Sequence, residues 1–297
     1  MSACVITGAT GYIGSHLTQY FVDQGYELHA LVREPSSMHG ESLHPAVRIW
    51  PYCGRYQEVA NVFRHLVHEP PIVIHFAAKV IYEHNSSILD DLISANITFG
   101  TQVLEAMQSY GSQFLINTGT YWQHNQEKYP RPNCLYAATK ESFQVIVDYF
   151  CKNYSISTIT LMLMDVYGPK DPRKKLFNQI QEHALTGKPI DLTHCEQQIN
   201  LVHINDVVEA YQCASELLRT KTIIGHYKYY VAHEDTYILK DVIEMYQKRI
   251  GRQLRINWGA KPYRKTEIMH PYIGERLPNW KANIDGYARS HVVCQNH

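Results

Sequence analysis

Three glycines near the start of the chain constrain its fold more than any other feature. Gly8, Gly11 and Gly14 stand at three-residue intervals directly after an apolar run at residues 4–7. Apolar residues then recur at helical spacing through residues 13–21. This pattern predicts a strand, a tight turn and a helix, in that order.

A turn of this composition suits the diphosphate of a dinucleotide. Glycine is required where the backbone angles are unusual, and where a Cβ atom would keep the main chain away from a pyrophosphate on the helix N-terminus. An ordinary strand-to-helix turn is the alternative, because glycine-rich turns are common. The turn lies between a strand and an amphipathic helix, which favours the dinucleotide site. The cofactor-binding candidates in this turn are Gly8, Gly11, Tyr12, Ile13 and Gly14.

Composition restricts the class of protein and the partners. The chain has 297 residues, of which 45% are hydrophobic and 19% charged, so it can form one large α/β domain or two unequal lobes. Its formal net charge is zero, and it contains no long run of Lys or Arg, so we expect neither nucleic acid nor an anionic membrane as a partner. No segment has the roughly 18 apolar residues of a membrane span, which makes the cytoplasm the default location. The seven cysteines are scattered without a Cys-x-x-Cys motif, which predicts reduced thiols and no metal site.

The end of the second predicted strand, residues 26–32, bears on the choice of cofactor. In dinucleotide folds an acid at this place accepts a hydrogen bond from the ribose 2′-hydroxyl, whereas a cation suits a 2′-phosphate. Val32 and Arg33 fill the place here, and the nearest acid is Glu34. We therefore predict NADP(H), with Arg33 as the phosphate partner. NAD is the alternative, in which Arg33 is only a solvated strand end.

Two further strand ends carry candidate residues. The apolar run at residues 72–78 ends in Ala77 and Ala78, which are small enough for a flat cofactor to lie against the backbone, although close helix packing explains them equally well. Another strand, at residues 114–117, is followed by Thr118 and Thr120. Open α/β sheets bind their ligands at the carboxyl ends of the strands, so we expect these residues to lie near the chemistry.

Tyr136 and Lys140 stand four residues apart in a predicted helix, so both side chains lie on one face. A free tyrosine has a pKa near 10 and is a poor acid–base group at neutral pH. A nearby ammonium and a cationic nicotinamide would stabilise its phenolate. The pair suits proton transfer to a carbonyl or an alcohol, although in a chain with 22 tyrosines the spacing also arises by chance.

The pattern changes after a sixth strand that we expect at residues 156–166. Prolines punctuate the following helical stretch, and no second glycine-rich turn appears. We predict an NADP-binding Rossmann domain over residues 1–168, built on a doubly wound parallel sheet. Residues 169–297 would form mostly a smaller, mixed α/β substrate-binding lobe, with residues 196–222 returning to the first domain.

Taken together, these motifs resemble the extended short-chain dehydrogenase/reductase family. The landmarks, in chain order, are Thr7-Gly8-Ala9-Thr10-Gly11-Tyr12-Ile13-Gly14, His75-Phe76-Ala77-Ala78, Thr118, Tyr136 to Lys140, Tyr167-Gly168-Pro169 and His203-Ile204-Asn205-Asp206. They cover about the first 210 residues. Within the family, residues 117–124 and 277–281 resemble the branch that makes CDP-linked dideoxysugars such as abequose and paratose.

The resemblance implies a role for each matching residue. Tyr136 would be the catalytic acid–base, and Lys140 would hold the nicotinamide ribose and lower the pKa of the tyrosine. Thr118 would hydrogen-bond the reacting oxygen, with Thr120 as the competing candidate because the loop aligns with a one-residue slip. Asn96 would support the site from its helix. The resemblance also implies a homodimer formed through the helices that hold Asn96 and Tyr136.

The chain departs from the family pattern on the substrate side. Most relatives carry an acid after the third strand, where this chain has Pro51-Tyr52-Cys53. Relatives carry Arg-x-x-Asn-x-Tyr-Gly-Pro on the sixth strand, where this chain has Met162 and Asp165. The substrate-binding candidates are therefore Thr118, Thr120, Tyr136 and Asp165.

The resemblance implies an NADPH-dependent reductase for the 4-keto group of a nucleotide-linked deoxysugar, with CDP as the favoured nucleotide. A nucleotide-sugar 4-epimerase is the alternative. A 4,6-dehydratase fits less well, because Gly119 and Thr120 stand where that branch has Asp-Glu. A dinucleotide-binding regulator without turnover is a third possibility, but such proteins usually lose the Tyr or the Lys that this chain keeps.

Overall fold

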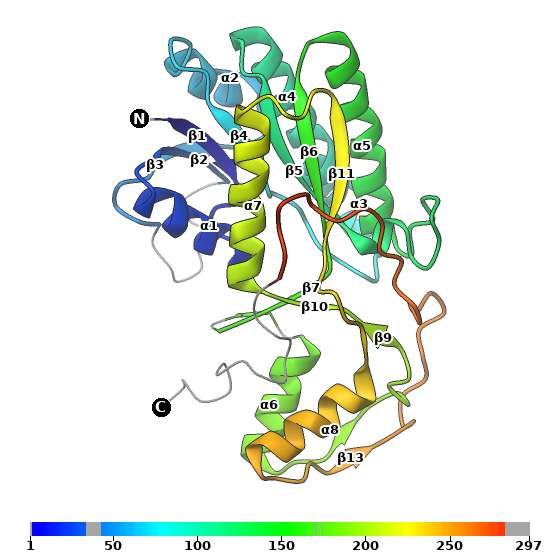
Figure 1. Ribbon diagram of the computed structural model, residues 1–297. Coiled ribbons are helices and arrows are strands. Elements are labelled where there is room, and N and C mark those ends of the chain that lie inside the picture. The colour runs from blue at the N-terminus through cyan, green and yellow to red at the C-terminus, as the bar shows by residue number, and fades with distance from the viewer. Residues whose placement is uncertain (1, 34–42, 170, 174, 283–297) are drawn as a thin grey trace.

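A seven-stranded sheet forms the centre of the computed structural model, which describes residues 2–33, 43–169, 171–173 and 175–282 (Figure 1). Every neighbouring pair of its strands is parallel. In spatial order the strands are β11 (His226–Val231), β6 (Ser157–Leu163), β5 (Phe114–Thr120), β4 (Ile72–His75), β1 (Ala3–Thr7), β2 (Glu27–Arg33) and β3 (Arg48–Tyr52). The strand order reverses between β1 and β4, so the predicted doubly wound parallel sheet is confirmed, and its switch point lies there.

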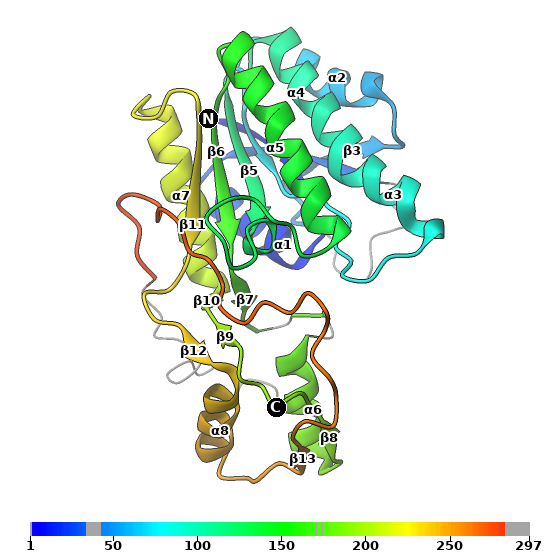
Figure 2. The ribbon, with the colours of Figure 1, turned by 90° about the vertical axis from the view of Figure 1, so that its right-hand side faces the viewer.

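Helices cover both faces of the sheet (Figures 1 and 2). On one face α1 (Tyr12–Asp23) packs against α7 (Ile204–Arg219). On the other face α4 (Phe99–Tyr110) lies between α2 (Tyr56–His65) and α5 (Leu135–Asn153). Each layer closes over its own apolar core, because the buried parallel strands present apolar side chains to both faces.

The helical stretch between β4 and β5 has an irregular centre. A 3₁₀ turn (Ser86–Ile88) leads into α3 (Leu89–Ile93), and a π-helical turn (Ser94–Thr98) then connects α3 to α4. The π turn holds the buried Asn96. Single π turns inside α-helices are frequent at functional sites, because the extra residue re-aims a side chain.

The sixth strand expected at residues 156–166 is in fact two strands. β6 ends at Leu163, and after Met164 the chain enters β7 (Asp165–Tyr167), which pairs in parallel with β10 (Leu201–His203) outside the main sheet. The sequence does not mark this break, because residues 161–164, at the end of β6 and just after it, are continuously apolar and no glycine or proline interrupts them. The consequence is that Asp165 lies below the carboxyl edge of the main sheet, in the region between the two lobes.

A smaller lobe extends from that edge (Figure 2). It contains α6 (Leu176–Thr186), α8 (Leu239–Ile250) and two pairs of short strands, which close over a separate apolar core. The pairs are β8 (Ile190–Asp191) with β13 (Ile256–Asn257), and β9 (Gln198–Ile199) with β12 (Tyr237–Ile238). Between these elements the chain returns to the main sheet as α7 and β11. The division at residue 168 stays a prediction.

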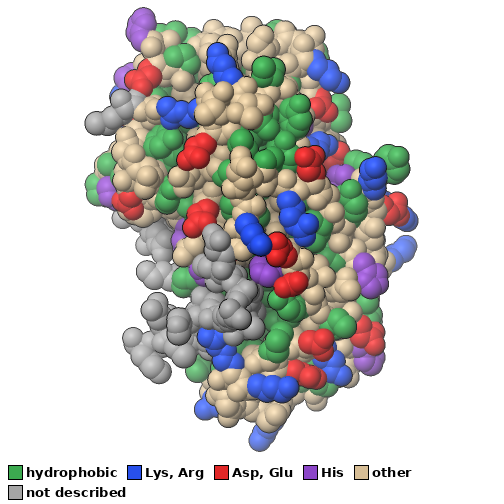
Figure 3. Space-filling model, in the orientation of Figure 1, with side chains coloured by type: hydrophobic (Ala, Val, Ile, Leu, Met, Phe, Trp, Pro, Cys, Tyr) green, Lys and Arg blue, Asp and Glu red, His purple; other side chains and the backbone are tan. Residues whose placement is uncertain are grey.

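The face seen in Figure 3 mixes acidic and basic side chains over both lobes. Among the residues that the structure describes, no helix is long and apolar enough to cross a membrane.

Substitution of Gly14 tests the packing of the first turn. A Cβ there would lie 2.0 Å from the Gly8 carbonyl oxygen, whereas a Cβ at Gly11 would meet that oxygen at 3.4 Å. Intrinsic propensity favours alanine in a helix by up to about 1 kcal/mol. We nevertheless expect Gly14→Ala to lower the free energy of unfolding by about 1–3 kcal/mol, because the backbone at Gly8 must move to make room for the methyl group. Urea unfolding of the cofactor-free protein measures this, with Gly11→Ala as the matched control. Equal stability of the two variants would show that the turn tolerates the methyl group.

Candidate active site

A cavity of about 640 Å³ opens at the switch point, along the carboxyl edge of the main sheet. It is lined by the turn between β1 and α1, by the ends of β2, β4 and β5, by the start of α5 and by residues 163–166. The structure brings all the sequence-predicted site residues to this one cavity: Gly8, Gly11, Tyr12, Ile13, Gly14, Arg33, Ala77, Ala78, Thr118, Thr120, Tyr136, Lys140 and Asp165. Their roles stay predictions.

The glycine turn has the properties of a diphosphate site. Gly11 is the N-cap of α1, makes no side-chain cap bond, and the first turn of the helix has no acidic residue. The backbone N–H groups at this helix end therefore remain available to an anion, which the helix dipole also favours. Gly8 has a φ of 74°, and a Cβ there would lie 2.8 Å from the Ala77 backbone nitrogen. These observations fit a dinucleotide held across the β1 and β4 ends.

A buried threonine fixes the end of β4 against β1. The Thr7 hydroxyl accepts hydrogen bonds from the backbone nitrogens of Phe76 and Ala77, at 3.1 Å each, and lies 2.9 Å from His75 Nδ1. Because two donors occupy its oxygen, the hydroxyl donates its proton to Nδ1, and the neutral ring carries its own proton on Nε2. Burial first, and the Lys140 charge second, lower the pKa of His75 to about 3. His75 is therefore a neutral structural partner.

Tyr136 and Lys140 are both buried on α5 and both line the cavity. Burial lowers the pKa of Lys140 to about 8. Burial, with a smaller contribution from Cys134, raises the pKa of Tyr136. The lowering of this pKa that the resemblance implies depends on a bound cofactor as well as on Lys140, so it stays a prediction.

Asn96 joins the loop after β4 to the helix that carries this pair. Its side-chain oxygen accepts a hydrogen bond from the Lys79 backbone nitrogen at 2.7 Å. Its amide nitrogen donates to the Lys79 carbonyl at 3.1 Å and to the Thr139 hydroxyl at 2.9 Å. Thr139 immediately precedes Lys140, so the π turn supports the site.

The two candidate threonines at the end of β5 have different surroundings. The Thr118 hydroxyl lies 2.8 Å from the hydroxyl of Tyr211, a fully buried residue of α7. The Thr120 hydroxyl accepts a long hydrogen bond, 3.4 Å, from the Trp122 backbone nitrogen and caps a 3₁₀ turn, η4 (Tyr121–Gln123). Tyr211 was not among the sequence candidates. Only its place on the apolar face of a helix is visible in the sequence.

Aromatic and charged side chains line the rest of the cavity. The ring of Trp122 lies edge-to-face with that of Tyr136, with centroids 6.0 Å apart. The Tyr121 hydroxyl donates to Asp165 Oδ2 at 3.0 Å. Burial raises the pKa of Asp165, and the nearby Lys175 acts in the opposite direction. Sequence reasoning gave neither Tyr121 nor Lys175 a role: Tyr121 lies in the family-like segment 117–124 without a task of its own, and Lys175 lies in no motif.

Arg33 ends β2 as an exposed residue at the cavity. Its charge acts on the phenol of Tyr52 and on the carboxylate of Asp91, so the guanidinium lies near both. Asp91 also forms an ion pair with Lys79, with Oδ2 and Nζ 2.5 Å apart. Glu34, the nearest acid in the sequence, lies outside the described residues.

No group of three or more His, Cys, Asp or Glu side chains that could hold a metal ion occurs within residues 2–33, 43–169, 171–173 and 175–282. Within the same ranges the cysteines are free thiols.

Comparison with known proteins places this site in a family. The model of the NAD dependent epimerase/dehydratase family matches residues 4–228, and the chain belongs to this family of extended short-chain dehydrogenase/reductase enzymes. Its cofactor is accordingly a nicotinamide dinucleotide.

Individual relatives resemble the chain over most of its length. A CDP-abequose synthase of Yersinia pseudotuberculosis is 27% identical over 97% of this chain and 98% of its own. Another, of Salmonella muenchen, is 26% identical over 90% and 87%. Among solved structures, a UDP-glucose 4-epimerase of Thermotoga maritima with UDP-glucose has a TM-score of 0.81 at 20% identity, over 96% of this chain and 95% of its own. MoeE5 in complex with UDP-glucuronic acid and NAD has a TM-score of 0.80 at 18% identity, over 97% and 96%.

Burial of Lys140 gives a testable stability effect. The folded-state pKa of about 8 lies below the ordinary lysine pKa of about 10.5, so burying the charged Lys140 costs about 3 kcal/mol of stability at pH values below 8. The cost falls as the pH rises from 8 towards 10.5, because over this range Lys140 loses its proton in the folded protein while it remains charged in the unfolded chain. We therefore expect Lys140→Met to raise the free energy of unfolding of the cofactor-free protein at pH 7, and the gain to shrink by pH 10.

Urea unfolding at several pH values measures the effect. Lys152→Met serves as the control, because Lys152 is exposed on the same helix. A gain for Lys140→Met that does not change with pH would contradict the electrostatic cause.

Proposed function

We propose that the protein reduces the 4-keto group of a nucleotide-linked deoxysugar, with CDP as the nucleotide and NADPH as the reductant. The observation that carries the proposal is the meeting of Tyr136, Lys140 and a threonine hydroxyl in the cavity of the glycine turn. The CDP-abequose synthases, similar over nearly the whole chain, support the substrate class.

Each residue has a defined task in this reaction. The bound nicotinamide supplies the hydride that reduces the keto carbon. Tyr136 donates its proton to the oxygen of that carbonyl, completing the alcohol, and Lys140 together with the bound cofactor would bring the pKa of its phenol down towards the working pH. Thr118 or Thr120 donates a hydrogen bond to the same oxygen as negative charge develops on it. Lys140 holds the ribose of the cofactor, and Asp165 contacts the substrate.

Arg33 at the end of β2 supports NADPH over NADH, because a guanidinium there suits a 2′-phosphate. It also supports a reductase over an epimerase. An epimerase regenerates its cofactor within each cycle, whereas a reductase draws on the reducing pool. The family contains both, and several structural neighbours are epimerases, so the 4-epimerase is the second candidate. A regulator without turnover is the third.

We also propose that the protein is a homodimer, as the family resemblance implies, and that it is located in the cytoplasm. Large apolar side chains are exposed on the helices that would form the dimer: Ile93 of α3, and Val145 and Tyr149 of α5.

A spectrophotometric assay separates the candidates. We expect the purified protein to oxidise NADPH stoichiometrically with a CDP-linked 4-keto-6-deoxy or 4-keto-3,6-dideoxy hexose, and to do nothing without NADPH. Tyr136→Phe should bind NADPH as before and lose about 10²–10⁴-fold in kcat, since only proton transfer loses its donor. Interconversion of two 4-hydroxy sugars without net NADPH loss would establish the epimerase. NADPH binding with no reaction on CDP-, dTDP- or GDP-linked keto sugars would favour the regulator.

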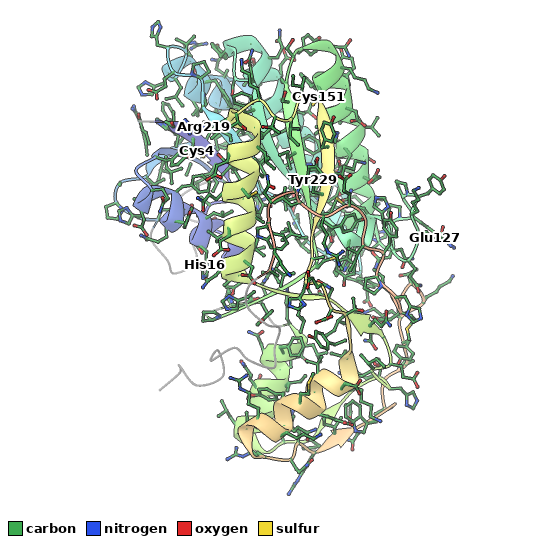
Figure 4. All side chains as sticks on the ribbon, in the orientation of Figure 1. Cys4, His16, Glu127, Cys151, Arg219 and Tyr229 are labelled. Carbon is green, nitrogen blue, oxygen red and sulfur yellow. The ribbon has the colours of Figure 1, made fainter. Side chains whose placement is uncertain are left out.

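Charge reversal at Arg33 tests the cofactor preference. Arg33→Asp should raise the KM for NADPH by about 10- to 100-fold, because a charge-assisted contact contributes about 1.5–3 kcal/mol. The KM for NADH should change little or fall. Arg219→Asp makes the same change in net charge at the far end of α7 and is the control (Figure 4). Equal use of NADH and NADPH by the unmodified protein would rule out this role.

A further inference from the structure

The pairing of Thr118 with Tyr211 determines which way the threonine hydroxyl points. The two hydroxyl oxygens are 2.8 Å apart, and either could be the donor on distance alone. Tyr211 is fully buried, with 0% of its surface exposed. Among the described residues, Thr118 is the one hydrogen-bond partner of its phenol.

Burial decides the direction of this hydrogen bond. If Thr118 donated, the Tyr211 O–H would be buried without an acceptor, which is costly. If Tyr211 donates instead, its proton is satisfied, and the Thr118 proton is directed elsewhere. Thr118 lines the cavity, and the structure gives its hydroxyl no other protein partner among the described residues. The favourable arrangement therefore leaves a donor aimed at a ligand in the cavity.

Rigid packing holds Tyr211 in this place. Its ring lies 4.8 Å from that of Phe76, which follows β4 and itself lines the cavity. Helix α7 packs directly against β5, the strand that ends in the two threonines. Tyr136, the proposed acid–base, lies close enough to Tyr211 to influence the pKa of its phenol. The phenol thus approaches Thr118 from behind, on the side away from solvent.

We propose that Tyr211 is a positioning residue that orients the Thr118 hydroxyl as a hydrogen-bond donor to the reacting oxygen. The proposal rests on the reductase function above, and it selects Thr118 over Thr120 as the hydroxyl partner. Tyr211 itself touches neither substrate nor cofactor in this scheme. Its contribution is that the donor is already oriented when the substrate binds, so no reorientation is needed during the reaction.

A double-mutant cycle tests the proposal. Tyr211→Phe removes one oxygen atom and keeps the ring, so the fold should be preserved. We expect it to lower kcat about 3- to 10-fold, the effect of one neutral hydrogen bond, with the KM for NADPH unchanged. Thr118→Val should lower kcat about 100-fold or more. In the Thr118→Val protein, Tyr211→Phe should cause no further loss, because no hydroxyl remains to orient.

The controls separate positioning from packing. Thr118→Ser keeps the hydroxyl, so Tyr211→Phe should again lower kcat in that background. Tyr229→Phe removes the hydroxyl of a buried tyrosine on β11 that does not line the cavity, and it should leave kcat unchanged (Figure 4).

Three outcomes would overturn the proposal. Equal losses from Tyr211→Phe with and without the Thr118 hydroxyl would mean that Tyr211 acts through packing alone. An unchanged kcat in Tyr211→Phe would mean that the hydroxyl does not act. A large loss in Thr120→Val with little loss in Thr118→Val would assign the oxygen contact to Thr120. An unmodified protein that turns over no keto sugar is a different result, which refutes the proposed function itself.

Discussion

The hydrogen bonds of the Thr7 hydroxyl are the interaction on which the site depends. They tie the backbone after β4 to the last residue of β1, so that two strands 68 residues apart in sequence end at a fixed separation. Gly8 then passes so close to Ala77 that a Cβ would not fit. The cavity opens where these strand ends diverge, and the helix N-terminus that would receive a diphosphate begins three residues later. A shift of β4 along β1 would move Phe76, Ala77 and Ala78 relative to the glycine turn.

The second constraint is the buried charge of Lys140. The desolvated ammonium of Lys140 lowers the stability of the fold, and neighbouring polar groups hold it one helical turn from the Tyr136 phenol. Asn96 joins the loop after β4 to Thr139, and the π turn gives the asparagine the reach to do so. A bound cofactor that contacts Lys140 would offset the cost of burying its charge. The protein is therefore less stable without cofactor, and its binding site is already formed.

The return of α7 to the first lobe completes the site from behind. Helix α7, far along the chain, places Tyr211 beside the end of β5. The break between β6 and β7 places Asp165 towards the second lobe. The cavity is therefore lined both by the first 140 residues and by segments that follow, such as residues 163–166 and Lys175.

Sequence alone determined the local chemistry of this protein. The glycine spacing, the apolar strands and the Tyr136 and Lys140 pair predict the sheet, the cofactor site and the acid–base group, because these features depend on residues close together in the chain. Tertiary structure alone decided the rest. The Thr118 and Tyr211 hydroxyls meet across 93 residues, and the Thr7 hydroxyl meets His75 across 68. Burial, which no local pattern reports, then raises the pKa of Tyr136 in the cofactor-free protein and sets the direction of the Tyr211 hydrogen bond.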